Sequence, residues 1–219
     1  MKTFYLAFLC FFLPAYLYSQ DWKPFKIDDS VQVSLPTGFK KIDTLGQTQI
    51  TAETSFGFIQ ITKQADNPHT TPDIEKVKHL NRYYNDFVKR IRTSSKNGTI
   101  SHEKDTVLGK LHVKDFSLEV DSGSGNQIRN FRLLHENGAT YSFQFLYKDI
   151  SKEYAIPESK TFFESIKITE PLTIESQFTT AGNTTGKAPR SNSTLFICIG
   201  AAVLALLLIL FFRRRKRSG

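Results

Sequence analysis

Residues 126–148 read NQIRNFRLLHENGATYSFQFLYK, and this stretch decides the fold. The runs 126–136 and 139–148 flank the dipeptide Asn137-Gly138, whose residues both tolerate the positive φ that a two-residue hairpin turn requires. In the second run aromatic residues recur at every second position, as in a strand with one buried face. The stretch therefore predicts an antiparallel hairpin in which Leu134 faces Tyr141 and Arg132 faces Phe143.

Further strands and two helices surround this hairpin. Apolar or alternating runs bounded by turn residues predict strands over 22–26, 31–35, 47–54, 56–63, 99–107, 110–121 and, as a short closing strand, 166–168. A stripe of apolar residues predicts a long helix that is capped at Thr70 or Thr71, has Pro72 in its first turn and ends near Arg92. Pro157 is expected to open a second helix. The predicted fold class is α+β, an antiparallel β-sheet with flanking helices, plus one C-terminal transmembrane helix.

One face of this sheet contains the candidate binding residues. If Asp121 and Gln127 are the first paired positions, that face carries Phe116, Leu118, Val120, Ile128, Leu134, Tyr141, Phe143, Phe145 and Tyr147, with Asn130 and Arg132 among them. One interpretation is that a helix covers the face and Arg132 extends past the rings to water. The other is that part of it stays open, and that Arg132, Asn130, Phe143 and Tyr141 bind an acidic or polar ligand. The sequence leaves both open.

Catalytic and metal-binding patterns are missing from the sequence. No two histidines have the helical spacing of a metal site, and both cysteines lie in the apolar terminal segments. A turn at Leu108-Gly109 would place His102 opposite Asp115, Glu103 opposite Lys114 and Asp105 opposite His112, which we interpret as cross-strand pairing. No motif of an activated nucleophile occurs. We therefore predict no catalytic residue, no metal and no cofactor.

The N-terminus has the pattern of a secretory signal peptide. Lys2 precedes the apolar run 4–13, Pro14 interrupts it, and Ser19 is a small residue before cleavage. We expect residues 1–19 to be removed and residues 20–170 to form an exported α+β domain.

The C-terminus has the pattern of a membrane anchor. Residues 194–212 are uncharged and mostly apolar, and 19 helical residues span about 28 Å, close to the hydrocarbon thickness of a bilayer. The basic residues Arg213, Arg214, Arg215, Lys216 and Arg217 follow directly and determine the topology, because such clusters stay cytoplasmic. Residues 213–219 thus form a cytoplasmic tail. Residues 171–193, rich in Ser, Thr and Gly, are expected to be a disordered stalk.

The net charge of +8 reflects this topology. Six of the 29 Lys and Arg residues lie in the signal and the tail, which leaves 23 against 21 Asp and Glu in between. The exported part is therefore nearly neutral, and we expect no nucleic-acid partner.

The order of elements resembles a known superfamily. The opening Val33-Ser34-Leu35-Pro36-Thr37-Gly38-Phe39, the long helix, the later strands and the closing Phe162-Phe163-Glu164-Ser165-Ile166 segment resemble the PsbP-like superfamily. That superfamily includes the extrinsic photosystem II protein, DcrB-type periplasmic proteins and a nuclear Ran-binding protein. The resemblance implies an α/β/α sandwich over about residues 24–169, without a common catalytic site. Most members lack a C-terminal transmembrane helix.

These observations favour a non-catalytic, single-pass binding module of the cell envelope, with its N-terminal domain outside the cytoplasm and its C-terminus inside. Its partners would be the bilayer, through residues 194–212, and an envelope protein or polar ligand. Two alternatives stay open. One is an envelope enzyme whose active site is dispersed in the sequence. The other is a surface-protein precursor whose anchor a sorting transpeptidase removes.

Candidate modification sites also occur. Three tripeptides fit the Asp-Ser/Thr-aliphatic pattern of O-glycosylation in exported bacterial proteins, namely Asp29-Ser30-Val31, Asp43-Thr44-Leu45 and Asp105-Thr106-Val107. Such short patterns also arise by chance.

Overall fold

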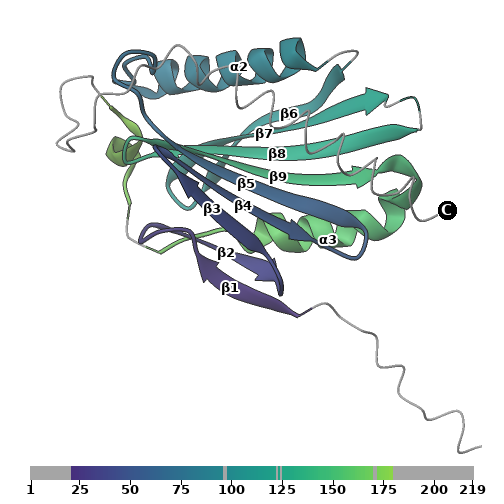
Figure 1. Cartoon of the computed structure of the whole chain (residues 1–219). Coiled ribbons are helices and arrows are strands. Elements are labelled where there is room, and N and C mark those ends of the chain that lie inside the picture. Colours follow the sequence, from purple (N-terminus) through teal and green to yellow (C-terminus); the bar gives the residue numbers. More distant parts are fainter. Residues whose placement is uncertain (1–20, 96–97, 122, 124, 170–171, 180–219) are drawn as a thin grey trace, which may run out of the picture.

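The computed structural model describes residues 21–95, 98–121, 123, 125–169 and 172–179 (Figure 1). The elements in chain order are β1 (Trp22–Lys26), β2 (Val31–Pro36), β3 (Lys40–Thr44), β4 (Gln47–Glu53), β5 (Gly57–Ala65), α2 (Val77–Ser94), β6 (Gly98–Leu108), β7 (Leu111–Asp121), β8 (Asn126–Glu136), β9 (Ala139–Lys148), the 3-10 turn η2 (Asp149–Ser151), α3 (Lys152–Glu164), β10 (Lys167–Ile168) and the 3-10 turn η3 (Ile174–Gln177).

The strands form two antiparallel sheets. The large sheet has seven strands in the order β3-β4-β5-β9-β8-β7-β6, and the small one has the order β1-β2-β10. The closing strand predicted over 166–168 therefore exists, but it pairs with β2 of the small sheet. The predicted β8–β9 hairpin is confirmed: Leu134 pairs with Tyr141, and Arg132 pairs with Phe143. Asn137 and Gly138 both have positive φ, 47° and 68°, as the two-residue turn requires.

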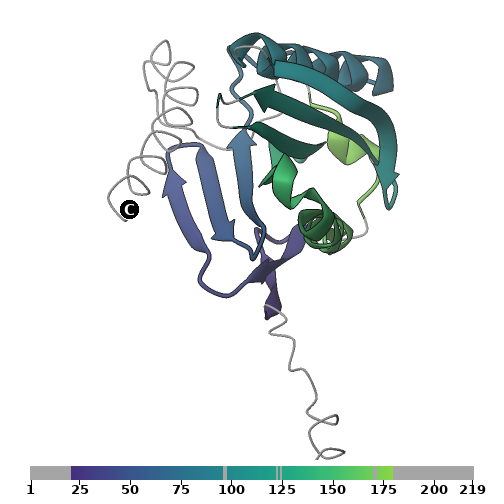
Figure 2. The same cartoon turned by 90° about the vertical axis from the view of Figure 1, so that its right-hand side faces the viewer.

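The two helices cover opposite faces of the large sheet (Figures 1 and 2). Helix α2 packs through Leu80, Tyr84 and Val88 on the face formed by the β6–β8 side of the sheet. Helix α3 and the small sheet cover the other face, where Phe162 packs against Phe143 and Phe145. An antiparallel sheet with flanking helices, as predicted from the sequence, is thus observed.

The predicted β7–β8 register is wrong by one residue. Asp121 pairs with Asn126, and Asp115 pairs with Arg132. Because a slip of one residue exchanges the two faces of a strand, the side chains of Phe116 and Leu118 pack in the cluster beneath α2 and not on the face of the Arg132 side chain. The physical reason is the loop between the strands, which allows either register where a tight turn would fix one.

The predicted β6–β7 register is also wrong. The two-residue turn is Gly109-Lys110, so Leu108 pairs with Leu111, and a β-bulge interrupts the ladder between Ser101 and Lys104. Neither the pair of His102 with Asp115 nor that of Asp105 with His112 forms in the ladder. The Lys114 ammonium nevertheless lies 2.7 Å from Glu103 and 3.0 Å from Asp105.

Three further boundaries differ from the prediction. Helix α2 starts at Val77, because Ile74 is held in an extended bridge with Thr179. Helix α3 starts at Lys152, with Pro157 inside it. Strand β3 was not predicted, since all five of its residues are exposed and leave no apolar pattern.

The chain stays packed beyond the expected end of the domain at residue 170. Gln177 is fully buried, and Ile74 and Thr179 exchange two backbone hydrogen bonds of 2.8 Å. Residues 172–179 are therefore part of the fold. The expected signal peptide, residues 171 and 180–193 of the expected stalk, the expected anchor and the basic tail lie outside the described residues. Within the part that is described, no helix combines the length and the apolar character needed to cross a membrane.

Candidate functional site

An open cleft of about 410 Å³ lies on the sheet face that carries α3. Helix α3 packs mainly over β9, β5 and β2, and the cleft opens beside it, over β7 and β8. The residues lining it are His102, Asp115, Phe116, Ser117, Glu119, Ile128, Asn130, Phe131, Arg132, Tyr147, Lys152, Ile156 and Phe163. Two acidic side chains, Asp115 and Glu119, and two basic ones, Arg132 and Lys152, are among them, so that their formal charges balance.

A fixed ion pair occupies one side of the cleft. The Arg132 guanidinium donates from Nε to Asp115 Oδ1 at 2.8 Å and from Nη2 to Asp115 Oδ2 at 2.7 Å. Its Nη1 donates to the carbonyl of Phe163 at 3.2 Å, and the guanidinium lies 5.6 Å from the centre of the Phe163 ring. This paired geometry restricts the rotamers of both charged groups and ties the end of α3 to the sheet.

A hydrogen-bonded set of uncharged groups lies beside the ion pair. Ser117 Oγ donates to Asn130 Oδ1 at 2.8 Å, and Asn130 Nδ2 donates to Ser159 Oγ on α3 at 3.2 Å. Burial raises the pKa of Tyr147; a hydrogen bond with Asn130 partly offsets this effect, and the charges of Asp149 and Glu119 add to it. The Tyr147 hydroxyl is thus neutral at physiological pH and can donate a hydrogen bond.

A distorted strand places a histidine at the cleft. His102 has φ of 53°, uncommon for a non-glycine residue, and lies in the β6 bulge. Its Nδ1 lies 3.0 Å from Ser101 Oγ, which donates to Glu119 Oε1 at 3.3 Å. The bulge thus aims a titratable side chain at the cleft.

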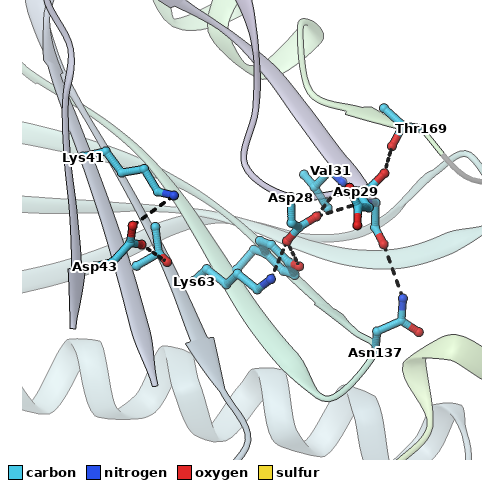
Figure 3. Close-up of polar contacts among 11 residues, drawn as sticks. Asp28, Asp29, Val31, Lys41, Asp43, Lys63, Asn137 and Thr169 are labelled. Atoms are coloured by element: carbon cyan, nitrogen blue, oxygen red, sulfur yellow. Dashed lines mark hydrogen bonds and ion pairs between the residues drawn. The ribbon is translucent and has the colours of Figure 1, made fainter. Parts of the chain in front are cut away.

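Only two of the four predicted binding residues line this cleft. Arg132 and Asn130 do, whereas Phe143 is buried beneath α3. Tyr141 lies at the other end of β9, where its hydroxyl donates to Asp28 Oδ2 at 2.5 Å. Asp28 also accepts a hydrogen bond from Lys63 at 2.5 Å, and Figure 3 shows this pair.

The hydrogen bonds of Asp28 with Lys63, Tyr141 and the β1–β2 turn stabilise the fold. Asp28 Oδ1 accepts hydrogen bonds from the backbone N–H groups of Ser30 and Val31, both at 2.9 Å, and so closes the β1–β2 turn. Burial raises the pKa of Asp28, but hydrogen bonds from Lys63 and Tyr141 outweigh it and hold that pKa below its ordinary value. Burial and the bond to Asp28 raise the pKa of Tyr141.

Several cleft residues were not predicted from the sequence. Asp115 and Ser117 appear beside Arg132 and Asn130 only when β7 is paired in its observed register. Lys152 and Ile156 lie in the part of α3 that precedes Pro157. Among the described residues, no three His, Cys, Asp or Glu side chains form a potential metal site.

Neither a family model nor a curated protein sequence matches the chain. Solved structures similar to it include LpqN, involved in cell envelope biogenesis of Mycobacterium tuberculosis (10% identity, 68% of this chain and 91% of that chain, TM-score 0.40). Another is the PsbP of Synechocystis sp. PCC 6803, with 8% identity, coverage of 70% of this chain and 95% of that chain, and a TM-score of 0.47. A third is the Ran-binding protein Mog1p of Saccharomyces cerevisiae, with 9% identity, coverage of 74% of this chain and 100% of that chain, and a TM-score of 0.43.

The neighbours thus include a PsbP and a Ran-binding protein, two of the kinds of protein named by the sequence resemblance. At these identities and TM-scores, membership of the PsbP-like superfamily stays a prediction.

Proposed function

We propose that the folded part is a non-catalytic binding module of the cell envelope, held outside the cytoplasm by the C-terminal anchor, and that the cleft beside α3 is its binding site. The cleft carries this proposal, because it is a concave site where polar groups from four strands, β6 to β9, and helix α3 converge. The signal-like N-terminus and the anchor-like C-terminus support the location.

The charge of the cleft favours a small neutral polar ligand, or a polar side chain of an envelope protein. Asp115 and Arg132 neutralise each other, so neither offers a free charge to an ionic ligand. Ser117 and Asn130 add donors and acceptors, while Ile156 and Phe163 provide apolar surface for the carbon skeleton of the ligand. An acidic ligand, which the sequence also allowed, would have to compete with Asp115 for Arg132.

The enzymatic alternative has one observation in its favour. A strained His102 lies beside Ser101 and Glu119 at the edge of the cleft. Strained backbone occurs at active sites, but also at structural bulges. We propose binding as the function because the Asp115 carboxylate is occupied by Arg132 at both oxygens and is not a free base.

Site-specific photo-crosslinking in intact cells tests the binding site. A photoreactive residue replaces Ile156, which lines the cleft, or Ile150, which is 92% exposed and is not a cleft residue. We expect an adduct of defined mass from position 156 and none of that mass from position 150. Equal adducts from both positions, or none from position 156, would refute the cleft as the site.

The orientation and the fate of the anchor need separate measurements. Protease added to cells with a permeabilised outer layer is expected to digest the folded part and to spare a tag after Gly219. A tag that is digested from outside contradicts the orientation. The intact mass separates a retained anchor from one removed by a transpeptidase.

A further inference from the structure

The three Asp-Ser/Thr-aliphatic tripeptides lie in different surroundings in the fold. Ser30, in the first one, is 9% exposed and lies in the closed β1–β2 turn. Its carbonyl accepts a hydrogen bond from the Thr169 N–H at 2.8 Å, and its hydroxyl lies 3.4 Å from Asn137 Nδ2. The Thr169 hydroxyl bonds the neighbouring Asp29 carbonyl (Figure 3). Another molecule has no access to this hydroxyl in the folded protein.

The second tripeptide, Asp43-Thr44-Leu45, is exposed to solvent. Thr44 is the last residue of β3, and the two-residue turn Leu45-Gly46 follows it. All residues of β3 are exposed, and Leu45 is 79% exposed. The Thr44 hydroxyl donates to the carbonyl of Gln47 at 3.2 Å, within the same turn. The residues that carry the acceptor hydroxyl, the preceding carboxylate and the following aliphatic side chain are therefore all exposed.

The side chain of Asp43 is held in place at this turn. Its Oδ1 accepts a hydrogen bond from Thr48 Oγ1 at 2.6 Å, and its Oδ2 lies 3.1 Å from Lys41 Nζ (Figure 3). These hydrogen bonds lower the pKa of Asp43. The Asp43 carboxylate, in the residue before Thr44, is thus charged at physiological pH.

The third tripeptide, Asp105-Thr106-Val107, is intermediate in the exposure of its hydroxyl residue. Thr106 lies in β6, the other edge strand of the large sheet, and is paired with Val113 of β7. Its side chain is half-buried, and its backbone is held in an eleven-residue strand. The fold therefore ranks the three hydroxyls by access, with Thr44 first, Thr106 second and Ser30 last.

We propose that the Thr44 hydroxyl is an O-glycosylation acceptor of the exported protein. In this step Oγ1 attacks the anomeric carbon of a lipid-linked glycosyl diphosphate. The bond between the anomeric carbon and the diphosphate oxygen breaks, the hydroxyl proton passes to a base of the glycosyltransferase, and the lipid diphosphate leaves. The proposal rests on the proposed function in one respect only, the export of residues 20–193 from the cytoplasm.

A glycan at Thr44 would also protect a vulnerable edge. Strand β3 ends the large sheet, and the unpaired backbone groups of an edge strand invite pairing with other chains. Ile42 and Leu45, on either side of Thr44, are 59% and 79% exposed. A bulky hydrophilic group between them covers this apolar edge, so that loss of the glycan is expected to increase self-association.

Mass spectrometry of the full chain, purified from membranes of its native host, tests the proposal. The intact mass reports removal of residues 1–19, and electron-transfer fragmentation of the peptide that contains residues 41–47 locates any sugar. We expect a glycan mass on Thr44 that is lost in Thr44→Ala, retained in Thr44→Ser and unchanged in Ser30→Ala. Asp43→Asn should remove most of it, since the pattern requires the acid.

The outcomes separate this proposal from the proposed function. An unmodified Thr44 in a chain that has lost residues 1–19 overturns glycosylation and leaves export intact. A chain that retains residues 1–19 and carries no sugar overturns both. If Ser30 carries sugar at the same occupancy as Thr44, the idea that accessibility in the folded protein selects the acceptor is wrong.

Discussion

Gln177→Ala tests whether the segment after β10 is an integral part of the fold. At this end the β7–β8 ladder stops at Val113 and Leu134. The Gln177 amide continues it: Oε1 accepts from the His112 N–H at 2.7 Å, and Nε2 donates to the carbonyls of His112 and His135 at 2.8 and 2.9 Å. The side chain thus satisfies three backbone groups of two different strands.

The expected loss follows from these three bonds. At about 0.5–1.5 kcal/mol for each net hydrogen bond, and with buried groups left unpaired, Gln177→Ala should cost roughly 2–4 kcal/mol of unfolding free energy. For a domain of this size that corresponds to a melting temperature lower by about 4–16 °C. Gln177→Leu, which keeps most of the volume, should lose nearly as much, because it restores none of the bonds.

Urea unfolding of residues 20–179, read by circular dichroism, measures this loss. Gln64→Ala is the matched control, since Gln64 is exposed and its amide bonds carbonyls at the surface, so it should change stability by less than about 0.5 kcal/mol. A chain that ends at residue 170 should be less stable than one that ends at residue 179. Equal stability of Gln177→Ala and the unaltered protein, together with equal stability of the two chain lengths, would refute the integral role of this segment.

Three other experiments test the packing and the electrostatics. Gly57→Ala should cost about 1–3 kcal/mol of unfolding free energy in the same assay, because a Cβ there would lie 2.5 Å from the Phe145 ring; a neutral effect would contradict this close approach. Asp28→Asn should cost roughly 1–3 kcal/mol at pH 7. Because the pKa of Asp28 is lowered on folding, its stabilisation is present above about pH 4 and disappears as the pH falls through the folded value, so the difference from the unaltered protein should shrink in acid; a constant difference from pH 7 to pH 2 would rule this out. Finally, a double-mutant cycle of Asp115→Ala and Arg132→Ala should give a coupling energy of about 1–3 kcal/mol, and a coupling near zero would mean that the bidentate pair does not form in solution.

Local turn chemistry explains which parts of the fold the sequence predicts. Asn137-Gly138 permits one tight turn, so the β8–β9 register followed directly from the sequence. The β7–β8 connection is longer and contains two glycines, so the register was one residue off and Phe116 was assigned to the wrong face. Strand β3 has no apolar alternation and is defined by pairing with β4 alone.

The same limits apply to the cleft. Arg132 and Asn130 were identified as polar residues in the middle of an apolar strand, and both line the cleft. Their partners Asp115 and Ser117 depend on the cross-strand register, which the sequence did not determine. Gln177 lies in a Ser- and Thr-rich segment with the composition of a linker, and only its long-range hydrogen bonds show that it belongs to the fold.

The binding role of the cleft is tested most directly by native mass spectrometry of the full chain, purified under mild conditions from its native host. The cleft should retain a small polar molecule. Ile156→Trp, which narrows the cleft at its rim, should lose that molecule, whereas Ile150→Trp on the exposed turn outside the cleft should keep it. A chain without any bound molecule, or one that keeps it equally in both variants, would contradict the binding of a small polar ligand in the cleft.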